Sequence, residues 1–348
     1  MGGDGHTAGV SLGLLAALSV SSDGLLVKLA SRDGAYLSTI MIVKAGTGVG
    51  FLLIFFFLFA LVTVCKEGSM RSLARYAIPS RVGVVHVMFG GGASGIMSLG
   101  FTLAFYYATS ANVLAFTALT PVWAALLTKP VLNMRLPWRT IWCNAGALAG
   151  TAVVVVGVAL ESVGDAPRSA RDTTLGTLFA IMVSVTAAAY LTTIRSAAVH
   201  APGTDMRLAS LFGMIIATCI SIALVPLLQP LDQPLLPANS RAIAWLTISG
   251  FFVVALALLL INAAVQLTSS PAEVSLILQI EGLLGPISVY AILGEVPSPF
   301  ALGGGCVVLL MVAIHETLAL FADRADRRAA STSPASDEHP QIPIKMIY

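Results

Sequence analysis

The chain has 348 residues and is poor in charge. Only 10% of its residues are charged, whereas a soluble domain carries about 25%, and 57% are hydrophobic. So few charges cannot cover a water-exposed surface, which excludes a soluble enzyme or a soluble binding module. The net charge of +2 gives no reason to expect a nucleic-acid partner. The expected setting is the lipid bilayer.

Ten apolar segments follow one another along the chain, separated by charges, prolines or polar clusters. Most are about 20 residues or longer, which is the length that an α-helix needs to cross a bilayer. The strands of a membrane barrel are about ten residues long and alternate in polarity, and these segments do neither. We therefore predict an all-α polytopic membrane protein with ten transmembrane helices, at 8–30, 39–65, 82–106, 108–128, 138–160, 174–198, 207–228, 242–266, 271–293 and 299–321.

Lys and Arg between these segments are distributed unevenly. If the N-terminus is cytoplasmic, the inner loops and the tail hold thirteen of them and the outer loops hold four. Such a bias follows the positive-inside rule and predicts that both termini are cytoplasmic, in a plasma membrane or an endomembrane. The proline-rich stretch 226–241 predicts an extended outer loop, and the polar composition of 322–348 predicts a disordered cytoplasmic tail.

The order of the segments suggests two similar halves, 8–160 and 174–321. Each half ends in a polar hairpin, an apolar span, a proline-containing turn and a glycine-rich closing span. In this alignment Asn112 corresponds to Glu273, and Thr120 corresponds to Glu281. Since each half has five spans, an odd number, the second half must insert upside down relative to the first. Inverted repeats of this kind are typical of secondary transporters.

Two stretches carry a resemblance to a known family: 106–121 in the first half, and 266–297 with its Glu281 and Leu293-Gly294-Glu295 in the second. Through them the chain resembles the EamA-type permeases of the drug/metabolite transporter superfamily. Asn133-Met134-Arg135 and Gly282 depart from the family's usual pattern. The resemblance implies two inverted five-helix repeats around a cavity lined by helices 1–4 and 6–9, with helices 5 and 10 peripheral. It does not name a substrate.

Ionisable residues within the apolar spans are the first candidates for a substrate or coupling site, because each is costly to insert. They are Asp23, Lys28, Lys44 and Glu281. For both carboxylates the alternative is a structural hydrogen bond within the bundle. We expect Lys28 and Lys44 near the outer ends of their helices, too far from Glu281 to pair with it, so that Glu281 would take a proton at rest. Glu273, by contrast, is expected to be a water-exposed residue at a span end.

Uncharged polar residues form a second group, which can either hydrogen-bond a ligand or join two helices. Its members are Tyr107, Asn112, Asn262 and Gln279. Pro121 and Pro286 lie in the corresponding helices of the two halves and are predicted to kink or break them, freeing backbone carbonyls toward the cavity.

Together these features predict a secondary transporter that exports or exchanges a small organic solute across the lipid bilayer by alternating access. The nearest alternative is a nucleotide-sugar or sugar-phosphate antiporter of the same superfamily, which would need several cations in the cavity. A channel or a non-transporting scaffold is a further alternative. No motif of an intramembrane enzyme, metal site or cofactor site occurs, so we expect none of these. Assembly as a homodimer is left open.

Overall fold

The computed structural model describes residues 3–67, 79–133, 138–161, 170–228, 239–268, 270–294 and 299–332. Within these ranges every regular element is a helix. In chain order the helices are α1 (Gly3–Val20), α2 (Asp23–Arg32), α3 (Leu37–Glu67), α5 (Arg81–Tyr107), α6 (Ser110–Thr117), α7 (Thr120–Leu132), α8 (Trp138–Glu161), α9 (Ala170–His200), α10 (Arg207–Leu228), α11 (Ser240–Ile248), the π-helix η1 (Ser249–Ala255), α12 (Leu256–Leu267), α13 (Pro271–Leu278), α14 (Glu281–Leu293) and α15 (Pro299–Thr332).

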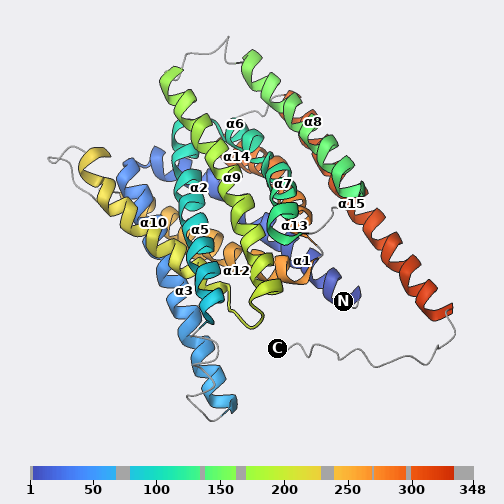
Figure 1. The fold of residues 1–348 in the computed structure, drawn as a ribbon. Helices are drawn as coiled ribbons and strands as arrows, with labels where there is room; N and C mark the ends of the chain where they lie inside the picture. The colour runs from blue at the N-terminus through green and yellow to red at the C-terminus, as the bar shows by residue number, and fades with distance from the viewer. Residues whose placement is uncertain are drawn as a thin grey trace.

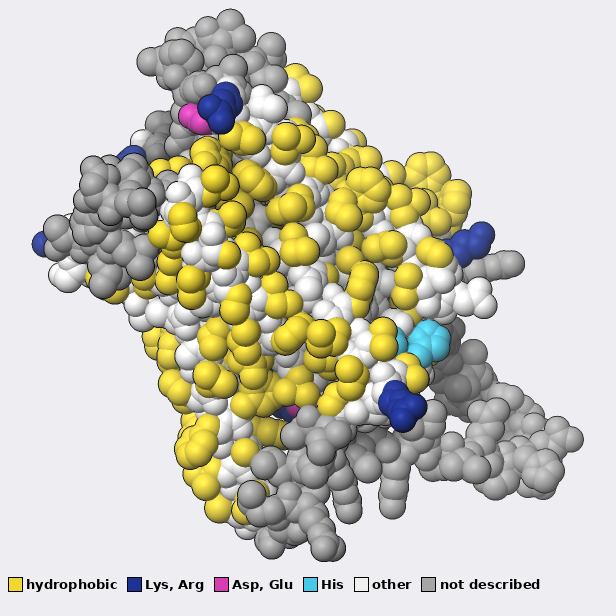
Figure 2. Space-filling model, turned by 60° about the vertical axis from the view of Figure 1, so that its left-hand side comes forward, with side chains coloured by type: hydrophobic (Ala, Val, Ile, Leu, Met, Phe, Trp, Pro, Cys, Tyr) yellow, Lys and Arg dark blue, Asp and Glu magenta, His cyan; other side chains and the backbone are white. Residues whose placement is uncertain are grey.

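The helices confirm an all-α, multi-pass membrane architecture. Eight helical stretches in the described part are long and apolar enough to cross a membrane. Figure 2 shows a surface that is largely hydrophobic, with Lys and Arg side chains mostly toward its margins. The predicted segments 82–106 and 108–128, and likewise 242–266 and 271–293, are separated by only a few residues, and the structure has short connections there: α5 ends at Tyr107 just before Ser110, and α12 ends at Leu267 just before Pro271.

Two segments differ from their predictions. Helix α15 continues to Thr332, so residues 322–332 are helical, whereas residues 333–348 of the predicted tail lie outside the described part. The extra turns are rich in Ala and Arg, which favour helix. The predicted outer loop 226–241 overlaps helix at its start, because α10 ends at Leu228, as predicted for the span 207–228, and includes Pro226; residues 229–238 of the loop lie outside the described part.

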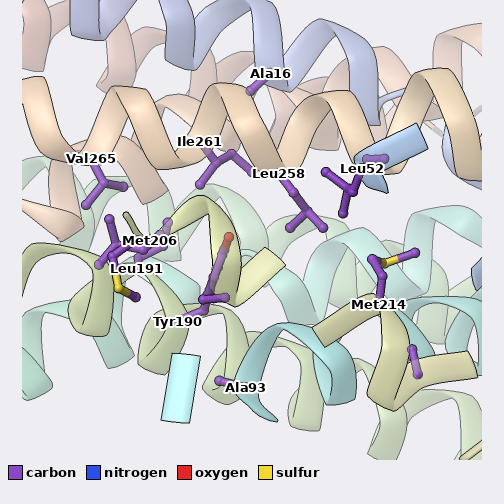
Figure 3. Packing of buried hydrophobic residues seen from close by; sticks show 14 of the residues in the cluster. Ala16, Leu52, Ala93, Tyr190, Leu191, Met206, Met214, Leu258, Ile261 and Val265 are labelled. Atoms are coloured by element: carbon purple, nitrogen blue, oxygen red, sulfur yellow. The ribbon is translucent and has the colours of Figure 1, made fainter. Parts of the chain in front are cut away.

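The main hydrophobic core lies where α1, α3, α5, α9, α10 and α12 meet, and includes Leu52, Leu191, Met214, Leu258 and Ile261 (Figure 3). Helices α8 and α15 pack against each other at one side of the bundle (Figure 1). Their close approach needs small residues: a Cβ at Gly150 would lie 2.8 Å from the carbonyl oxygen of Gly304. Neither of these two helices contributes a described residue to the cavity in the interior of the bundle.

Candidate functional site

Three helices break at the same place in the interior of the bundle. The breaks lie between α1 and α2, between α6 and α7, and between α13 and α14, and each leaves two residues outside regular helix. The last residue before every break and the first residue after it line a single cavity of about 870 Å³, its open mouth included. These residues are Val20 and Asp23, Thr117 and Thr120, and Leu278 and Glu281.

The break before α7 has a simple chemical cause. Pro121, the second residue of α7, has no N–H and cannot bond the carbonyl of Thr117 four residues earlier. The hydroxyl of Thr120 donates to that carbonyl instead, at 2.6 Å. The break thus lies within two residues of Pro121, where the sequence predicts a kink or a break.

Pro286 was predicted to kink or break its helix, and the prediction of a break is wrong. Helix α14 runs through residue 286 without interruption, and the break lies at Gln279 and Ile280. There the backbone makes three-residue turns, with Gly282 N–H donating to Gln279 at 2.9 Å. Counting from the breaks, the counterpart of Pro121 is Gly282, so the two prolines are not equivalent.

Asp23, the first residue of α2, lies in a buried ion pair. Its Oδ2 accepts a hydrogen bond from Nζ of Lys44 on α3 at 2.6 Å, and its Oδ1 accepts one from the hydroxyl of Ser249 at 2.6 Å. Asp23 and Lys44 are only 2% and 1% exposed. Lys44 lies seven residues after the start of α3 and, although it was expected to be remote from the centre of the bundle, it lines the cavity. Both oxygens of Asp23 are occupied by protein groups.

Ser249 begins the π-helical segment η1, which widens a helix that is otherwise α-helical on both sides. Ser19, near the end of α1, donates its hydroxyl to the carbonyls of Phe252 and Val253 in this segment. A Cβ at Gly250 would collide with the backbone carbonyl of Lys44, so α3 approaches η1 to backbone contact. The π segment therefore joins the broken first helix to the helix that carries Lys44. Insertions of this type are frequent at functional sites.

Glu281, the first residue of α14, is the second carboxyl group of the cavity. It is 9% exposed, and among the described residues its Oε1 has no hydrogen-bond partner. Asp23 and Lys44 are both close enough to interact with it electrostatically. Lys44 thus lies closer to Glu281 than predicted, but its hydrogen bond goes to Asp23.

Tyr190 of α9 contributes an aromatic ring to the cavity and is held by a buried polar cluster. Its hydroxyl lies 2.7 Å from Nδ2 of Asn262 and 2.8 Å from Oγ of Ser210. Figure 3 shows the ring extending toward the helix that carries Leu258 and Ile261, which also line the cavity. Asn262 does not line the cavity itself; it donates a hydrogen bond to the Tyr190 hydroxyl and so holds the ring in place.

Of the eight candidate site residues named from the sequence, the structure brings four to the cavity: Asp23, Lys44, Gln279 and Glu281. Lys28 is partly buried and does not line the cavity. Tyr107 stacks on Phe179 with ring centroids 6.2 Å apart, and Asn112 donates to Thr177 of α9 at 3.2 Å. These two residues, at the end of α5 and the start of α6, thus contact α9 and not the cavity.

Glu273 also differs from its prediction as a water-exposed residue. It is 2% exposed, and its Oε1 lies 2.6 Å from Nε2 of His6 at the start of α1. Arg195 of α9 interacts with it electrostatically. The sequence reasoning missed this link and the roles of Ser249 and Tyr190, since a single serine or tyrosine in an apolar run carries no pattern. The adjacent small residues Ser249 and Gly250 could have indicated a close approach of two helices at this point, because small residues let helix backbones come together.

Comparison with protein families and with curated proteins gives no match. Among solved structures, 28 chains match. One of them, described only as "Crystal structure of protein", superposes with a TM-score of 0.61 at 18% sequence identity, over 91% of this chain and 99% of that chain. The likeness shows that the fold as a whole occurs in an experimentally determined structure.

Proposed function

We propose that the protein is a secondary transporter of a small organic solute, which it exports or exchanges by alternating access. The observation that carries this proposal is the convergence of three broken helices and a π segment on one buried cavity with two carboxyl groups and a lysine. Irregular backbone at membrane depth is tolerated where it lines a cavity, and discontinuous helices of this kind form the solute sites of secondary transporters.

We further propose that the bundle consists of ten membrane helices in two inverted five-helix repeats, as in the EamA-type permeases that the sequence resembles. Helices α6 and α7 have 8 and 13 residues, and so do α13 and α14. In both halves the third residue of the leading half-helix bonds the first helix of the other half. These links are Asn112 with Thr177 on α9 and Glu273 with His6 on α1.

The antiporter of nucleotide sugars or sugar phosphates fits this cavity less well. Phosphate recognition relies on several Arg or Lys donors. Lys44 is the one cationic side chain among the residues that line the cavity, and its ammonium group already bonds Asp23. An anionic ligand would therefore have to compete with a buried carboxylate for a single lysine.

For orientation we propose that both termini are cytoplasmic, on the strength of the uneven distribution of Lys and Arg. Tyr36 lies between α2 and α3, and Pro202 lies between α9 and α10, and both are exposed. In protein freed of its four native cysteines, an impermeant thiol reagent added outside intact cells should label Tyr36→Cys and leave Pro202→Cys unlabelled. The reverse pattern would overturn the orientation.

Solute binding can be tested without knowing the substrate. Purified protein is screened against a broad metabolite panel by thermal shift, since a ligand present at 100 times its Kd stabilises the folded form by about 2.7 kcal/mol. Each hit is then loaded, unlabelled, into proteoliposomes, and uptake of the labelled compound is followed. A carrier should show uptake that is faster into loaded vesicles than into empty ones. Equal uptake into both would favour a channel, and no flux for any hit would favour a scaffold.

A further inference from the structure

The charges at the cavity define which ligands it can accept. Three lining residues carry formal charge: Asp23, Lys44 and Glu281. Asp23 and Lys44 form a hydrogen-bonded pair whose charges cancel, and the remaining oxygen of Asp23 is bonded to Ser249. The cavity therefore has a net charge of about −1 with Glu281 ionised and about zero with Glu281 protonated. With this ion pair intact, neither state is positive.

Among the described residues that line the cavity, Glu281 is the one with a buried polar atom that has no hydrogen-bond partner. Its side chain is more than nine-tenths buried at the wall, and Oε1 has no partner in the described part of the chain. A buried carboxylate oxygen without a donor is costly, so a ligand that brings a donor there gains a charge-assisted hydrogen bond. A ligand carboxylate or phosphate would be repelled at the same point whenever Glu281 is ionised.

The rest of the wall indicates an organic ligand and not a metal ion. Phe101, Leu114, Tyr190, Leu258 and Ile261 surround the polar groups with apolar and aromatic surface. Aromatic faces attract organic cations, whereas Mg²⁺ or Ca²⁺ needs about six oxygen ligands. In the described residues no group of three His, Cys, Asp or Glu side chains is placed to hold a metal ion.

We propose that the cavity selects organic cations, with the substrate's ammonium group against Glu281 and its apolar body against Phe101 and the neighbouring aliphatic side chains. This proposal concerns binding alone, and it rests on the proposed transport function only for the movement of the bound cation across the membrane. Zwitterions are disfavoured, because their carboxylate would need Lys44, which is committed to Asp23.

Four compounds with the same phenyl body separate the possibilities: 2-phenylethylamine as cation, 3-phenylpropionate as anion, phenylalanine as zwitterion and 2-phenylethanol as neutral control. Binding of each to the purified full-length protein is measured by calorimetry in detergent at one pH and one salt concentration. We expect the amine to bind at least tenfold more tightly than any of the other three. In Glu281→Gln its affinity should fall about tenfold or more, to the level of the alcohol.

Glu273→Gln is the matched control, since Glu273 is a buried carboxylate that does not line the cavity. It should leave the preference for the amine unchanged, and gel filtration and circular dichroism should show both variants folded. Tighter binding of the anion or the zwitterion, no binding of the amine, or an amine preference that survives Glu281→Gln would overturn the proposal. None of these outcomes bears on whether the protein is a carrier, which the uptake assay decides separately.

Discussion

Replacing Lys44 with methionine is expected to destabilise the protein by about 3–5 kcal/mol, because Asp23 would be left buried without its cation. The pair lies with side chains only 2–3% exposed, so water cannot take the place of the ammonium group. The measurement is the midpoint of unfolding in detergent, by denaturant or by temperature. A loss of this size would also be visible as a low yield of folded protein.

Two further variants make this prediction specific. Lys66→Met changes an exposed lysine at the end of the same helix and should cost less than about 0.5 kcal/mol. Asp23→Asn combined with Lys44→Met removes both charges while Ser249 can still donate to residue 23, so most of the lost stability should return. If Lys44→Met is as stable as Lys66→Met, the pair does not hold the broken first helix against α3.

Replacing Glu281 with glutamine is expected to abolish proton-driven accumulation of solute while leaving the fold intact. Glutamine keeps the size and hydrogen-bonding capacity of the side chain but cannot carry a proton across. The other titratable side chains at the cavity are Asp23, Lys44 and Tyr190, and protein groups hydrogen-bond each of them. Glu281 is therefore the group best placed to exchange a proton for substrate.

The expected loss of solute accumulation in Glu281→Gln follows from the size of the pH gradient that drives it. In a one-for-one exchange, a gradient of one pH unit supports an accumulation ratio of up to about ten. The ratio should be about ten in the unmodified protein and about one in Glu281→Gln, whereas Glu273→Gln should behave as the unmodified protein does. Accumulation with unchanged pH dependence in Glu281→Gln would show that the residue is structural.

The sequence predicted the helices well because their cause is local. Runs of apolar residues of membrane-spanning length have few alternatives to helix in a bilayer, and every predicted segment contains helix in the structure. Asp23 and Glu281 were identified for the same reason, since a carboxyl group within an apolar run is costly unless it has a role.

The place of Lys44 at the cavity could not be predicted from the local pattern of apolar residues. Helix α3 has 31 residues, well over the approximately 20 needed to cross a bilayer, so the distance of a residue from the helix end does not give its depth. Lys44 lies seven residues after Leu37, or about 10 Å along the axis. The partner of a buried charge and the π segment at Ser249 depend on packing between distant helices, which no local pattern records.

Alternating access itself is tested most directly at Thr120, which lies at a helix break on the cavity wall and is 7% exposed. Thr120→Cys is prepared in cysteine-free protein and reconstituted in a single orientation into vesicles that hold a trapped dye of the same size as an impermeant thiol reagent. Thr151→Cys, on the buried face of the peripheral helix α8, serves as the control.

The reagent is applied to either side of the membrane. We expect Thr120→Cys to react from both sides while the vesicles keep the dye, because the cavity opens to each side in turn and never to both at once, and Thr151→Cys to react from neither. Labelling of Thr120→Cys from one side alone, or loss of the dye, would contradict an alternating carrier.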